Sequence, residues 1–344
     1  MNDPALALII NILNERSLNT LLVIDENCDV SQLKNINKPN NITAITQRFD
    51  QHQQLQKMGF KAHLSDYNFS NLAADKYAFV AMRIGKQKAI SHHVINQAYS
   101  VLRTSGQLIL AGGKQEGIQS IAKKLKAIAP AYKKTRAKGQ NEAYIFDLYP
   151  ATNSFDDSGY KQLRPAAKYE DTHFLSKPGL YGWQKIDTGS ALLIDGISSE
   201  PINEQHSLLD LGCGYGFLSV MAARNFGVNV TATDNNIAAV NACNANLQHF
   251  NCKGVAINDD CANNISDTFN VVLCNPPFHS GFSTNHSLTE RFLSAARNHL
   301  CPDGTAYFVV NDFIPLAKKA ASLFNSIELL NTAGGFNVFR LKNA

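Results

Sequence analysis

Residues 207–224 read SLLDLGCGYGFLSVMAAR, and this stretch decides the fold. Its first five residues are mostly apolar and predict a buried strand, whereas the apolar spacing from Phe217 onward predicts a helix. Gly212, Gly214 and Gly216 lie between the two, where glycines let the backbone turn and approach a ligand closely at a helix start. Nucleotide oxidoreductases and plain tight turns also use such a loop, so the loop alone does not fix the ligand.

The rest of the second half alternates strand-like runs with helical patterns, which predicts parallel βα units in a doubly wound α/β sheet. Further strands are expected at residues 229–233, 254–257, 270–274, 305–310, 326–330 and 336–341, and helices at 236–250 and 288–300. The last two strands are joined by residues 331–335, which contain Gly334 and Gly335 and predict an antiparallel hairpin. Seven mostly parallel strands with this ending differ from a dinucleotide dehydrogenase, whose sheet usually stays parallel at that edge.

The first half repeats the plan of the second. Residues 101–113, VLRTSGQLILAGG, align with residues 299–311, HLCPDGTAYFVVN, so that Leu102 matches Leu300 and Gly106 matches Gly304. This predicts two tandem Rossmann-like domains that arose by duplication, although any two α/β sheets share some of this punctuation. The expected division is a first domain over 1–150, a linker with a short hairpin over 151–178, and a second domain over 179–344.

Composition excludes several classes of protein. The 344 residues are 44% apolar and 17% charged, which fits globular domains and neither a disordered nor a fibrous chain. The apolar run at 5–13 is too short to cross a bilayer, and no basic segment precedes it, so we expect a soluble, cytosolic protein. The seven cysteines include no C-x-x-C pair and the ten histidines show no ligand spacing, so we expect neither disulfides nor a metal site.

Charge is unevenly divided along the chain. Residues 1–150 contain 19 Lys and Arg against 11 Asp and Glu, a net charge of +8, whereas residues 151–344 contain 13 against 17, a net charge of −4. The basic residues are densest at 123–138, KKLKAIAPAYKKTRAK, which includes Lys133, Lys134 and Arg136. This asymmetry suits contact with a polyanion, although a solvated helix face explains the run equally well by itself.

Polar residues follow successive strands of the second half, where carboxyl ends of parallel strands meet at one edge. Asp234 is placed to accept both hydroxyls of a ribose, and Asp260 to accept from an adenine amino group. Together with the glycine loop, these tips indicate an adenosine-containing cofactor, although either aspartate alone is equally well explained as an exposed helix cap. The residues predicted to bind it are Asp210, Gly212, Gly214, Gly216, Asp234, Asn235, Asp259, Asp260 and Asn275.

The fourth polar strand end lies in residues 271–282, VVLCNPPFHSGF, and it indicates the type of reaction. An exocyclic base amine is a poor nucleophile until two acceptors take its N–H bonds and turn its lone pair toward an electrophile. The Asn275 oxygen and the Pro276 carbonyl suit those two roles, because Pro276 and Pro277 preset the backbone and remove competing donors. Phe278 offers a face for an unstacked base. The electrophile is then a methyl on a sulfonium, since nothing resembles a metal site or a nucleophile with its base.

These motifs together resemble the bacterial ribosomal RNA guanine-N2 methyltransferases. The resemblance is carried by the GCGYG loop, by NPPF followed by His279, and by residues 178–194, PGLYGWQKIDTGSALLI, and it covers nearly the whole chain. The small-subunit (16S) enzymes are the nearest match and the large-subunit (23S) enzymes are close relatives. The family pattern F-S-x-x-x-x-D-x-G-[ST] is altered here, because Tyr181 and Gly182 replace the Phe-Ser, but Asp187, Gly189 and Ser190 are kept.

The resemblance implies two class I methyltransferase domains, of which only the second binds S-adenosylmethionine. Gly212, Gly214, Asp234 and Asp260 would hold that cofactor, and Asn275, Pro276 and Phe278 the target base. In the first half, Asp25, Asn27 and Asp29 stand where a simple alignment expects the glycines, and residues 84–88 contain no Asn-Pro-Pro. We expect a fold copy that lost its chemistry yet carries a net charge of +8 to be an RNA platform, with Lys133, Lys134 and Arg136 among its contacts.

The sequence therefore predicts a methyltransferase that uses S-adenosylmethionine to methylate the N2 amine of a guanine in 16S ribosomal RNA. We expect it to act in the cytoplasm as a monomer on the assembled small subunit, with no membrane partner. His279 is a candidate contact to the base or a phosphate. The alternatives are a 23S enzyme, an adenine-N6 or glutamine-N5 methyltransferase with a related tip, a nonenzymatic RNA-binding factor, and a nicotinamide oxidoreductase.

Overall fold

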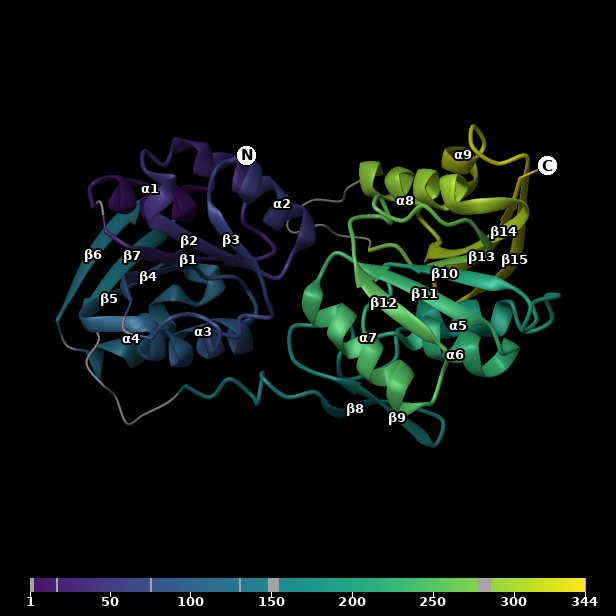
Figure 1. Cartoon of the computed structure of the whole chain (residues 1–344), viewed down its shortest axis with the longest axis horizontal. Coiled ribbons are helices and arrows are strands. Elements are labelled where there is room, and N and C mark those ends of the chain that lie inside the picture. Colours follow the sequence, from purple (N-terminus) through teal and green to yellow (C-terminus); the bar gives the residue numbers. More distant parts are fainter. Residues whose placement is uncertain are drawn as a thin grey trace. The chain divides into compact units, whose positions relative to one another are not determined.

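The computed structural model describes residues 3–16, 18–74, 76–129, 131–147, 155–277 and 286–343. The chain divides into two compact units, unit 1 (Met1–Gln162) and unit 2 (Leu163–Ala344). Each unit contains one seven-stranded sheet with helices on both of its faces (Figure 1). Within the described residues, no helix is both long enough and apolar enough to cross a membrane.

The sheet of unit 2 is doubly wound and ends in an antiparallel hairpin, as predicted. Its strands follow one another as β12-β11-β10-β13-β14-β16-β15, and all neighbours up to β14 pair in parallel, whereas β16 pairs antiparallel with both β14 and β15. The strands are β10 (Ser207–Leu211), β11 (Asn229–Asp234), β12 (Gly254–Asn258), β13 (Phe269–Cys274), β14 (Leu300–Asn311), β15 (Ser326–Ala333) and β16 (Phe336–Lys342).

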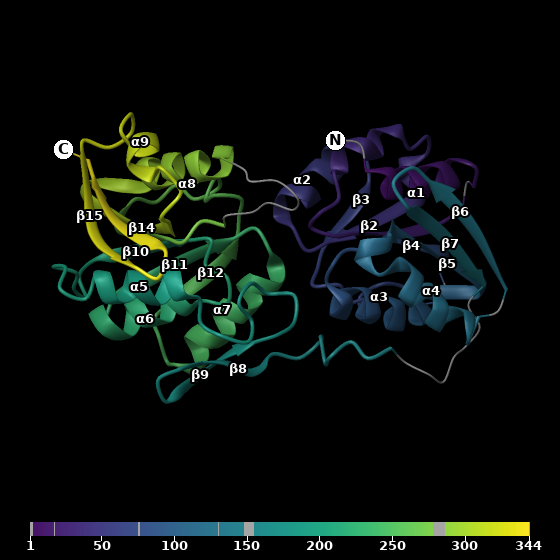
Figure 2. The same ribbon diagram turned by 180° about the vertical axis from the view of Figure 1, so that it is seen from behind.

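Two apolar layers bury the faces of this sheet. One face is covered by α5, α6 and α7, and the other by α8 and α9 (Figures 1 and 2). The helices begin and end at α5 (Thr188–Gly196), α6 (Phe217–Phe226), α7 (Ile237–His249), α8 (His286–His299) and α9 (Leu316–Ala320).

The closing hairpin forms because two glycines adopt backbone angles that other residues avoid. Gly334 and Gly335 have φ of +58° and +80°, as required at both central positions of a type I′ hairpin turn. The predicted strands were right in place but short, since β14 begins at Leu300, directly after α8, rather than at Thr305. The antiparallel ending predicted from the Gly-Gly pair is thereby confirmed.

The hairpin expected within residues 151–178 consists of β8 (Arg164–Tyr169) and β9 (Thr172–Ser176), and it packs on unit 2. Phe174 of β9 is fully buried in the cluster that surrounds α6 and α7. The Asn246 side chain of α7 donates to the Leu175 carbonyl at 2.8 Å and accepts from the Leu175 N–H at 2.8 Å. The hairpin is therefore fixed to unit 2 by both apolar burial and hydrogen bonds.

Unit 1 repeats the same strand order, β3-β2-β1-β4-β5-β7-β6, with an antiparallel β5-β7-β6 ending. Helices α3 and α4 lie against one face, and α1 and α2 against the other. The elements are α1 (Pro4–Asn14), β1 (Thr20–Ile24), β2 (Ile42–Thr46), α2 (Phe49–Lys57), β3 (Lys61–Leu64), β4 (Tyr77–Arg83), α3 (Lys88–Val101), β5 (Leu102–Gly113), α4 (Ile118–Lys126), β6 (Tyr132–Ala137) and β7 (Asn141–Asp147).

The two glycines aligned in the sequence occupy equivalent places in the two sheets. A Cβ on Gly106 would lie 2.9 Å from Leu102 Cδ2, and a Cβ on Gly304 would lie 2.8 Å from Leu300 Cδ2. The same register shift precedes them, between Tyr77 and Phe79 in β4 and between Phe269 and Val271 in β13. These shared irregularities support the predicted repetition of the fold, because an unrelated α/β sheet would have no reason to reproduce them.

Unit 1 differs from unit 2 where the glycine loop would be. Only two short 3-10 helices, η1 (Val30–Asn35) and η2 (Pro39–Asn41), connect β1 to β2, in the place that α6 occupies between β10 and β11. Since Thr20 and Leu208 pair with the equivalent residues Phe79 and Val271, the positions that match the three glycines are 24, 26 and 28. The simple alignment with Asp25, Asn27 and Asp29 was thus one residue out of register, and unit 1 still lacks the glycines.

Candidate active site

The four strand tips singled out in the sequence lie side by side in unit 2. Parallel pairing aligns Leu211 with both Thr233 and Cys274, and it aligns Asp234 with Asn258. The residues that follow these strands therefore share the carboxyl edge of the sheet, which is where ligands bind in open α/β folds.

The glycine loop between β10 and α6 is held against the tip of β11. The N–H groups of Gly212 and Cys213 donate to the Thr233 carbonyl at 2.8 and 2.9 Å, and the Gly214 N–H donates to Asp234 Oδ2 at 3.0 Å. All three glycines have positive φ, of +79°, +55° and +90° along the chain. This conformation explains why the loop requires glycine.

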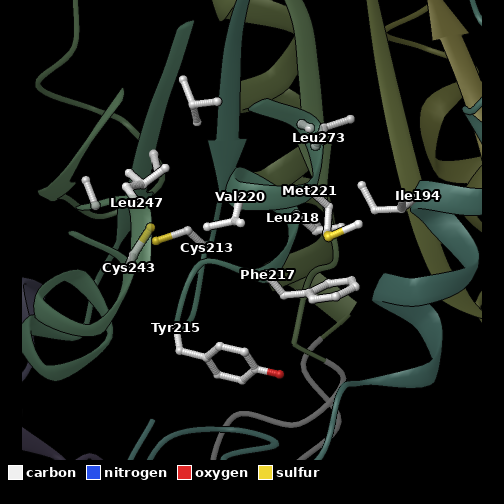
Figure 3. Packing of buried hydrophobic residues seen from close by; sticks show 14 of the residues in the cluster. Ile194, Cys213, Tyr215, Phe217, Leu218, Val220, Met221, Cys243, Leu247 and Leu273 are labelled. Carbon is white, nitrogen blue, oxygen red and sulfur yellow. The ribbon is translucent and has the colours of Figure 1, made fainter. Parts of the chain in front are cut away.

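The glycines serve different purposes. A Cβ at Gly214 would meet nothing within 4 Å, so this glycine faces open space in front of the loop. A Cβ at Gly216 would lie 2.7 Å from the sulfur of Cys243, so this glycine allows the loop to pack against α7. Figure 3 shows the Cys213 and Cys243 side chains pointing toward one another, with Val220 of α6 beside them in the same apolar cluster. Gly214 is therefore the position best suited to a ligand that approaches the backbone.

Asp234 ends β11 and organises the loops on either side of it. Its Oδ2 receives the Gly214 N–H, and its Oδ1 receives the Asn236 N–H at 2.8 Å. Asn236 then caps α7 by accepting from the Ala238 N–H at 2.8 Å. The carboxylate is thus fixed at the edge of the open space in front of Gly214, where its predicted contact with a ribose remains a prediction.

Asp210 lies inside the sheet on β10, two residues before Gly212. It is fully buried, and the Ser219 hydroxyl of α6 donates to its Oδ2 at 2.6 Å. Burial raises the pKa of Asp210 to about 7, and the nearby Asp234 carboxylate adds to this, while the Ser219 bond acts in the opposite direction. Its Oδ1 is enclosed without a hydrogen-bond partner in the described part of the chain. Any effect of Asp210 on a cofactor would therefore pass through the loop and α6 that it supports.

The third tip brings Asp259, Asp260 and Asn235 together after β12. Asp259 is buried and accepts from the Asn264 N–H at 2.9 Å, which closes the loop that follows. Asp260 is partly exposed, and it accepts from Asn235 Nδ2 at 3.5 Å and from Arg291 of α8 at 2.5 Å. The role of Asp260 as a base acceptor therefore remains a prediction. In that role, its carboxylate would accept from a base amine while it is paired with Arg291.

The fourth tip follows β13. The Asn275 Nδ2 donates to Asp187 Oδ1 at 2.7 Å and to Ser190 Oγ at 2.8 Å. Pro276 is buried and Pro277 is exposed. Phe278 and His279, predicted to contact the target base, lie outside the described residues. Both N–H bonds of the Asn275 amide therefore donate to protein atoms. The amide oxygen can act as a hydrogen-bond acceptor for a ligand.

Asp187 and Ser190 are site residues to which the sequence assigned no role. Asp187 is the N-cap of α5, where its Oδ1 also accepts from the Ser190 N–H at 2.9 Å. Its Oδ2 accepts from the Tyr181 hydroxyl at 3.1 Å. The retained D-x-G-S pattern was the available signal, because an aspartate that directly precedes an apolar helical run is typical of a helix N-cap.

In unit 1, an arginine occupies the place of Asn275. The pairing of β4 with β5 and of β13 with β14 makes Arg83 equivalent to Asn275. Arg83 is buried, and its guanidinium lies 2.8 Å from Asp3 Oδ2 and 2.5 Å from Glu116 Oε1. In unit 1, an ion-pair cluster thus occupies the strand end that corresponds to the one carrying Asn275 in unit 2. This agrees with the predicted loss of chemistry in the first half.

The three basic residues predicted to contact RNA do not share one face. They lie on β6, an edge strand, where side chains alternate between the two faces of the sheet. Lys134 and Arg136 lie on the face of Glu142, whose carboxylate is 2.8 Å from the Lys134 Nζ and 3.5 Å from the Arg136 Nε. Lys133 occupies the alternate position and therefore belongs to the opposite face.

Comparison with known proteins follows the same division of the chain. The family model described as the methyltransferase small domain N-terminal region matches residues 14–155, and the methyltransferase small domain matches residues 171–340. A relative from Aeromonas hydrophila named ribosomal RNA small subunit methyltransferase C is 28% identical over 271 residues, 78% of each chain. The protein of that name from Vibrio vulnificus is 24% identical over 324 residues, 93% of this chain and 92% of its own.

A solved structure also has this two-domain architecture. The 16S rRNA N2 G1207 methyltransferase of T. Thermophilus, in complex with AdoMet and guanosine, superposes with a TM-score of 0.83 at 21% identity, covering 98% of this chain and 92% of that chain. The sheet order, the glycine loop and the Asn-Pro-Pro tip define unit 2 as a class I methyltransferase domain, and unit 1 is a second domain of the same fold. The chain belongs to the methyltransferase small domain family, and the resemblance to the small-subunit ribosomal RNA methyltransferases is confirmed.

Proposed function

We propose that the protein methylates the exocyclic N2 amine of a guanine in 16S ribosomal RNA, with S-adenosylmethionine as the cofactor. The observation that carries this proposal is the orientation of the Asn275 amide, whose two N–H bonds are directed to Asp187 and Ser190. An amide held in this way offers its oxygen as an acceptor, which is what a base amine requires from its neighbour. The curated relatives act on ribosomal RNA by name, which supports the choice of substrate.

The residues of unit 2 fit an adenosine cofactor. The open space in front of Gly214 leaves room for a ligand against the loop backbone, and Asp234 and Asp260 place carboxylates along the same edge. When bound there, S-adenosylmethionine supplies an activated methyl group. No general base is required before transfer, because the amine becomes acidic as the new bond forms.

The tip of β13 performs the remaining steps. The Asn275 oxygen accepts one N–H of the guanine amine, and the Pro276 carbonyl accepts the other. Since both acceptors are fixed by the backbone and by hydrogen bonds, the amine lone pair is oriented before the reaction rather than during it. Phe278 stacks on the flipped base and His279 contacts the base or a phosphate, as the sequence predicts.

RNA binding by unit 1 is a further part of the proposal. The face of β6 that carries Lys134 and Arg136 also includes Tyr132, whose exposed fraction is 42%. The Lys126 Nζ lies 4.2 Å from the centroid of the Tyr132 ring. Cations beside an exposed aromatic ring suit a phosphate backbone with an unpaired base, so this face is the better candidate for contact with RNA. We propose that the protein binds the assembled small subunit as a monomer in the cytoplasm.

Methylation of purified ribosomal particles tests the proposal. Small subunits from cells that lack the protein are incubated with the enzyme and methyl-labelled cofactor, and the nucleosides are identified by mass spectrometry. We expect N2-methylguanosine in 16S RNA, and a loss on the order of 10² to 10³ in rate for Asn275→Ala. Asn229→Ala, an exposed asparagine at the amino end of β11, is the matched control.

The same assay separates the competing functions. Incorporation into large subunits in place of small subunits indicates the 23S alternative, and N6-methyladenosine or methylglutamine indicates a different acceptor. No incorporation into any of these, with intact binding to ribosomal particles, would support a nonenzymatic factor. Full activity of Asn275→Ala would contradict the role given to this amide.

A further inference from the structure

The strand tip that carries Asn275 is supported from outside its own strand. Asp187 and Ser190, which bond the Asn275 amide, both come from the start of α5, more than 80 residues earlier in the chain. A carboxylate at neutral pH only accepts hydrogen bonds, so the amide must present its nitrogen to Asp187 and its oxygen away from it. The contact therefore fixes which end of the Asn275 amide faces the substrate.

Asp187 is itself held by three donors. Its Oδ1 receives the Ser190 N–H at 2.9 Å as well as the Asn275 amide, and its Oδ2 receives the Tyr181 hydroxyl at 3.1 Å. The helix that it caps is packed closely against the sheet, since a Cβ at Gly189 would lie 2.9 Å from the ring of Phe336. The carboxylate thus has little freedom to turn, and its position is transmitted to Asn275.

The same connection exists in unit 1. Asp3 is the N-cap of α1, where its Oδ1 accepts from the N–H groups of Ala5 and Leu6 at 2.9 and 3.1 Å. Its Oδ2 accepts from Arg83, the residue equivalent to Asn275. Both units therefore join a helix-capping aspartate to the tip of the strand that carries the active-site position. Only in unit 2 does this connection end on a neutral amide that exposes an acceptor.

We infer that Asp187, Ser190 and Tyr181 are positioning residues that hold Asn275 with its oxygen toward the substrate amine. This inference rests on the proposed function of Asn275. Tyr181 thereby has a role although the residue is 70% exposed, since its hydroxyl donates to the Oδ2 of Asp187 and holds that oxygen in place. Loss of the support lowers the turnover number and leaves the affinity for S-adenosylmethionine unchanged.

One pair of variants separates positioning from helix capping. Asp187→Ser keeps an N-cap of comparable strength, but the shorter side chain does not reach Asn275. We expect thermal stability close to wild type and a turnover number reduced by about 10 to 100-fold. Asp195→Asn, which removes an exposed carboxylate from the same helix, is the matched control and keeps wild-type activity. Wild-type turnover for Asp187→Ser would overturn the inference.

A reciprocal exchange provides the second test. Asn275→Asp alone places two carboxylates at hydrogen-bond distance, so they repel each other or share a proton, and turnover falls by about 100-fold. Adding Asp187→Asn restores a donor and an acceptor at this contact, and one carboxylate oxygen again faces the substrate. We expect the double variant to recover at least about tenfold over Asn275→Asp. A double variant as inactive as Asn275→Asp would contradict the inference.

The support is also measurable without cofactor or substrate. In protein labelled with ¹⁵N-asparagine, Asn275→Ala identifies the side-chain NH₂ signals of Asn275. We expect these signals to exchange slowly with solvent in the wild type, and to shift and exchange faster in Asp187→Ser. Unchanged signals in that variant would overturn the inference. If the wild type does not methylate small subunits, the proposed function fails, while the NMR result still decides the support.

Discussion

The sulfur of Cys243 lies 2.7 Å from the point where a Cβ on Gly216 would stand. The glycine loop can therefore pack on α7 only because this position has no side chain. Gly214, two residues earlier, has open space at the same point. The two glycines of one short motif thus meet opposite requirements, one for internal packing and one for the approach of a ligand.

Alanine substitution at these two positions is expected to separate stability from binding. Gly216→Ala adds a clash with Cys243 and an unfavourable φ, so it lowers the melting temperature and the yield of folded protein. The new Cβ in Gly214→Ala meets no atom of the protein. We expect its positive φ to lower the unfolding free energy by about 1 kcal/mol. We expect the affinity for S-adenosylmethionine to fall more than it does in Gly216→Ala. Calorimetry for stability and for binding checks both. Equal effects of the two variants on binding would contradict this division.

Asp210 is expected to make the stability of unit 2 depend on pH. Its folded-state pKa is raised from 3.8 to about 7, so between these values the folded state holds a proton that the unfolded state releases. The unfolding free energy therefore falls as pH rises through this window, and the penalty is complete above pH of about 7. Asp210→Asn removes the penalty and keeps an acceptor for Ser219.

The measurement is a comparison of the two proteins over pH. We expect Asp210→Asn to equal the wild type near pH of about 4 and to exceed its unfolding free energy by about 2 to 4 kcal/mol near pH of about 8. Urea unfolding of the apo protein followed at several pH values provides the numbers. A constant difference between the two proteins across this range would show that Asp210 does not titrate in the window.

Arg83 is expected to be a stability residue of unit 1 with no part in the reaction. Its guanidinium is flanked by Asp3 and Glu116, whose side chains are 13% and 7% exposed. Arg83→Ala leaves these carboxylates enclosed without their counter-charge, which costs about 3 to 5 kcal/mol. Chemical denaturation should show the loss, whereas S-adenosylmethionine affinity stays at the wild-type value. A matched loss of cofactor affinity would argue against this assignment.

Basic residues on opposite faces of β6 are expected to differ in their effect on RNA binding. If the face with Tyr132 contacts the small subunit, Lys126→Glu and Arg136→Glu weaken binding about five to tenfold each and flatten its dependence on salt. Lys133→Glu, on the other face, leaves both unchanged. Binding of labelled protein to small subunits at several salt concentrations distinguishes them. An equal effect of Lys133→Glu would mean that the edge of the strand, rather than one face, makes the contact.

The sequence was sufficient for the architecture because periodic apolar runs and turn residues are local signals. The glycine loop, the Gly334-Gly335 turn and the aligned Gly106 and Gly304 each report a backbone requirement at one place in the chain. Strand tips were also predictable, since parallel strands must bring their carboxyl ends to one edge. Boundaries were less accurate, as with β14, because Pro302, Asp303 and Gly304 form a turn signal in the sequence but lie inside the strand, which begins at Leu300.

The side-chain contacts that complete the site could not be predicted from local sequence signals. Asp187 and Asn275 are 88 positions apart, and nothing near either residue indicates the other. Alternation on β6 separates Lys133 from its two basic neighbours, although the three are nearly consecutive in the sequence. In both cases the relevant fact is which side chains the folded backbone places together, and residue type alone does not contain it.

The ion-pair cluster around Arg83 has an evolutionary consequence. Replacing Arg83 with asparagine in one step would leave Asp3 and Glu116 as buried carboxylates without a counter-charge. Unit 1 would therefore lose stability before it gained any chemistry. The cluster therefore opposes substitution of Arg83, because any uncharged replacement loses both ion pairs. A single change of Arg83 to asparagine is therefore disfavoured, whereas loops and surface positions that do not contact this cluster can change without the same loss of stability.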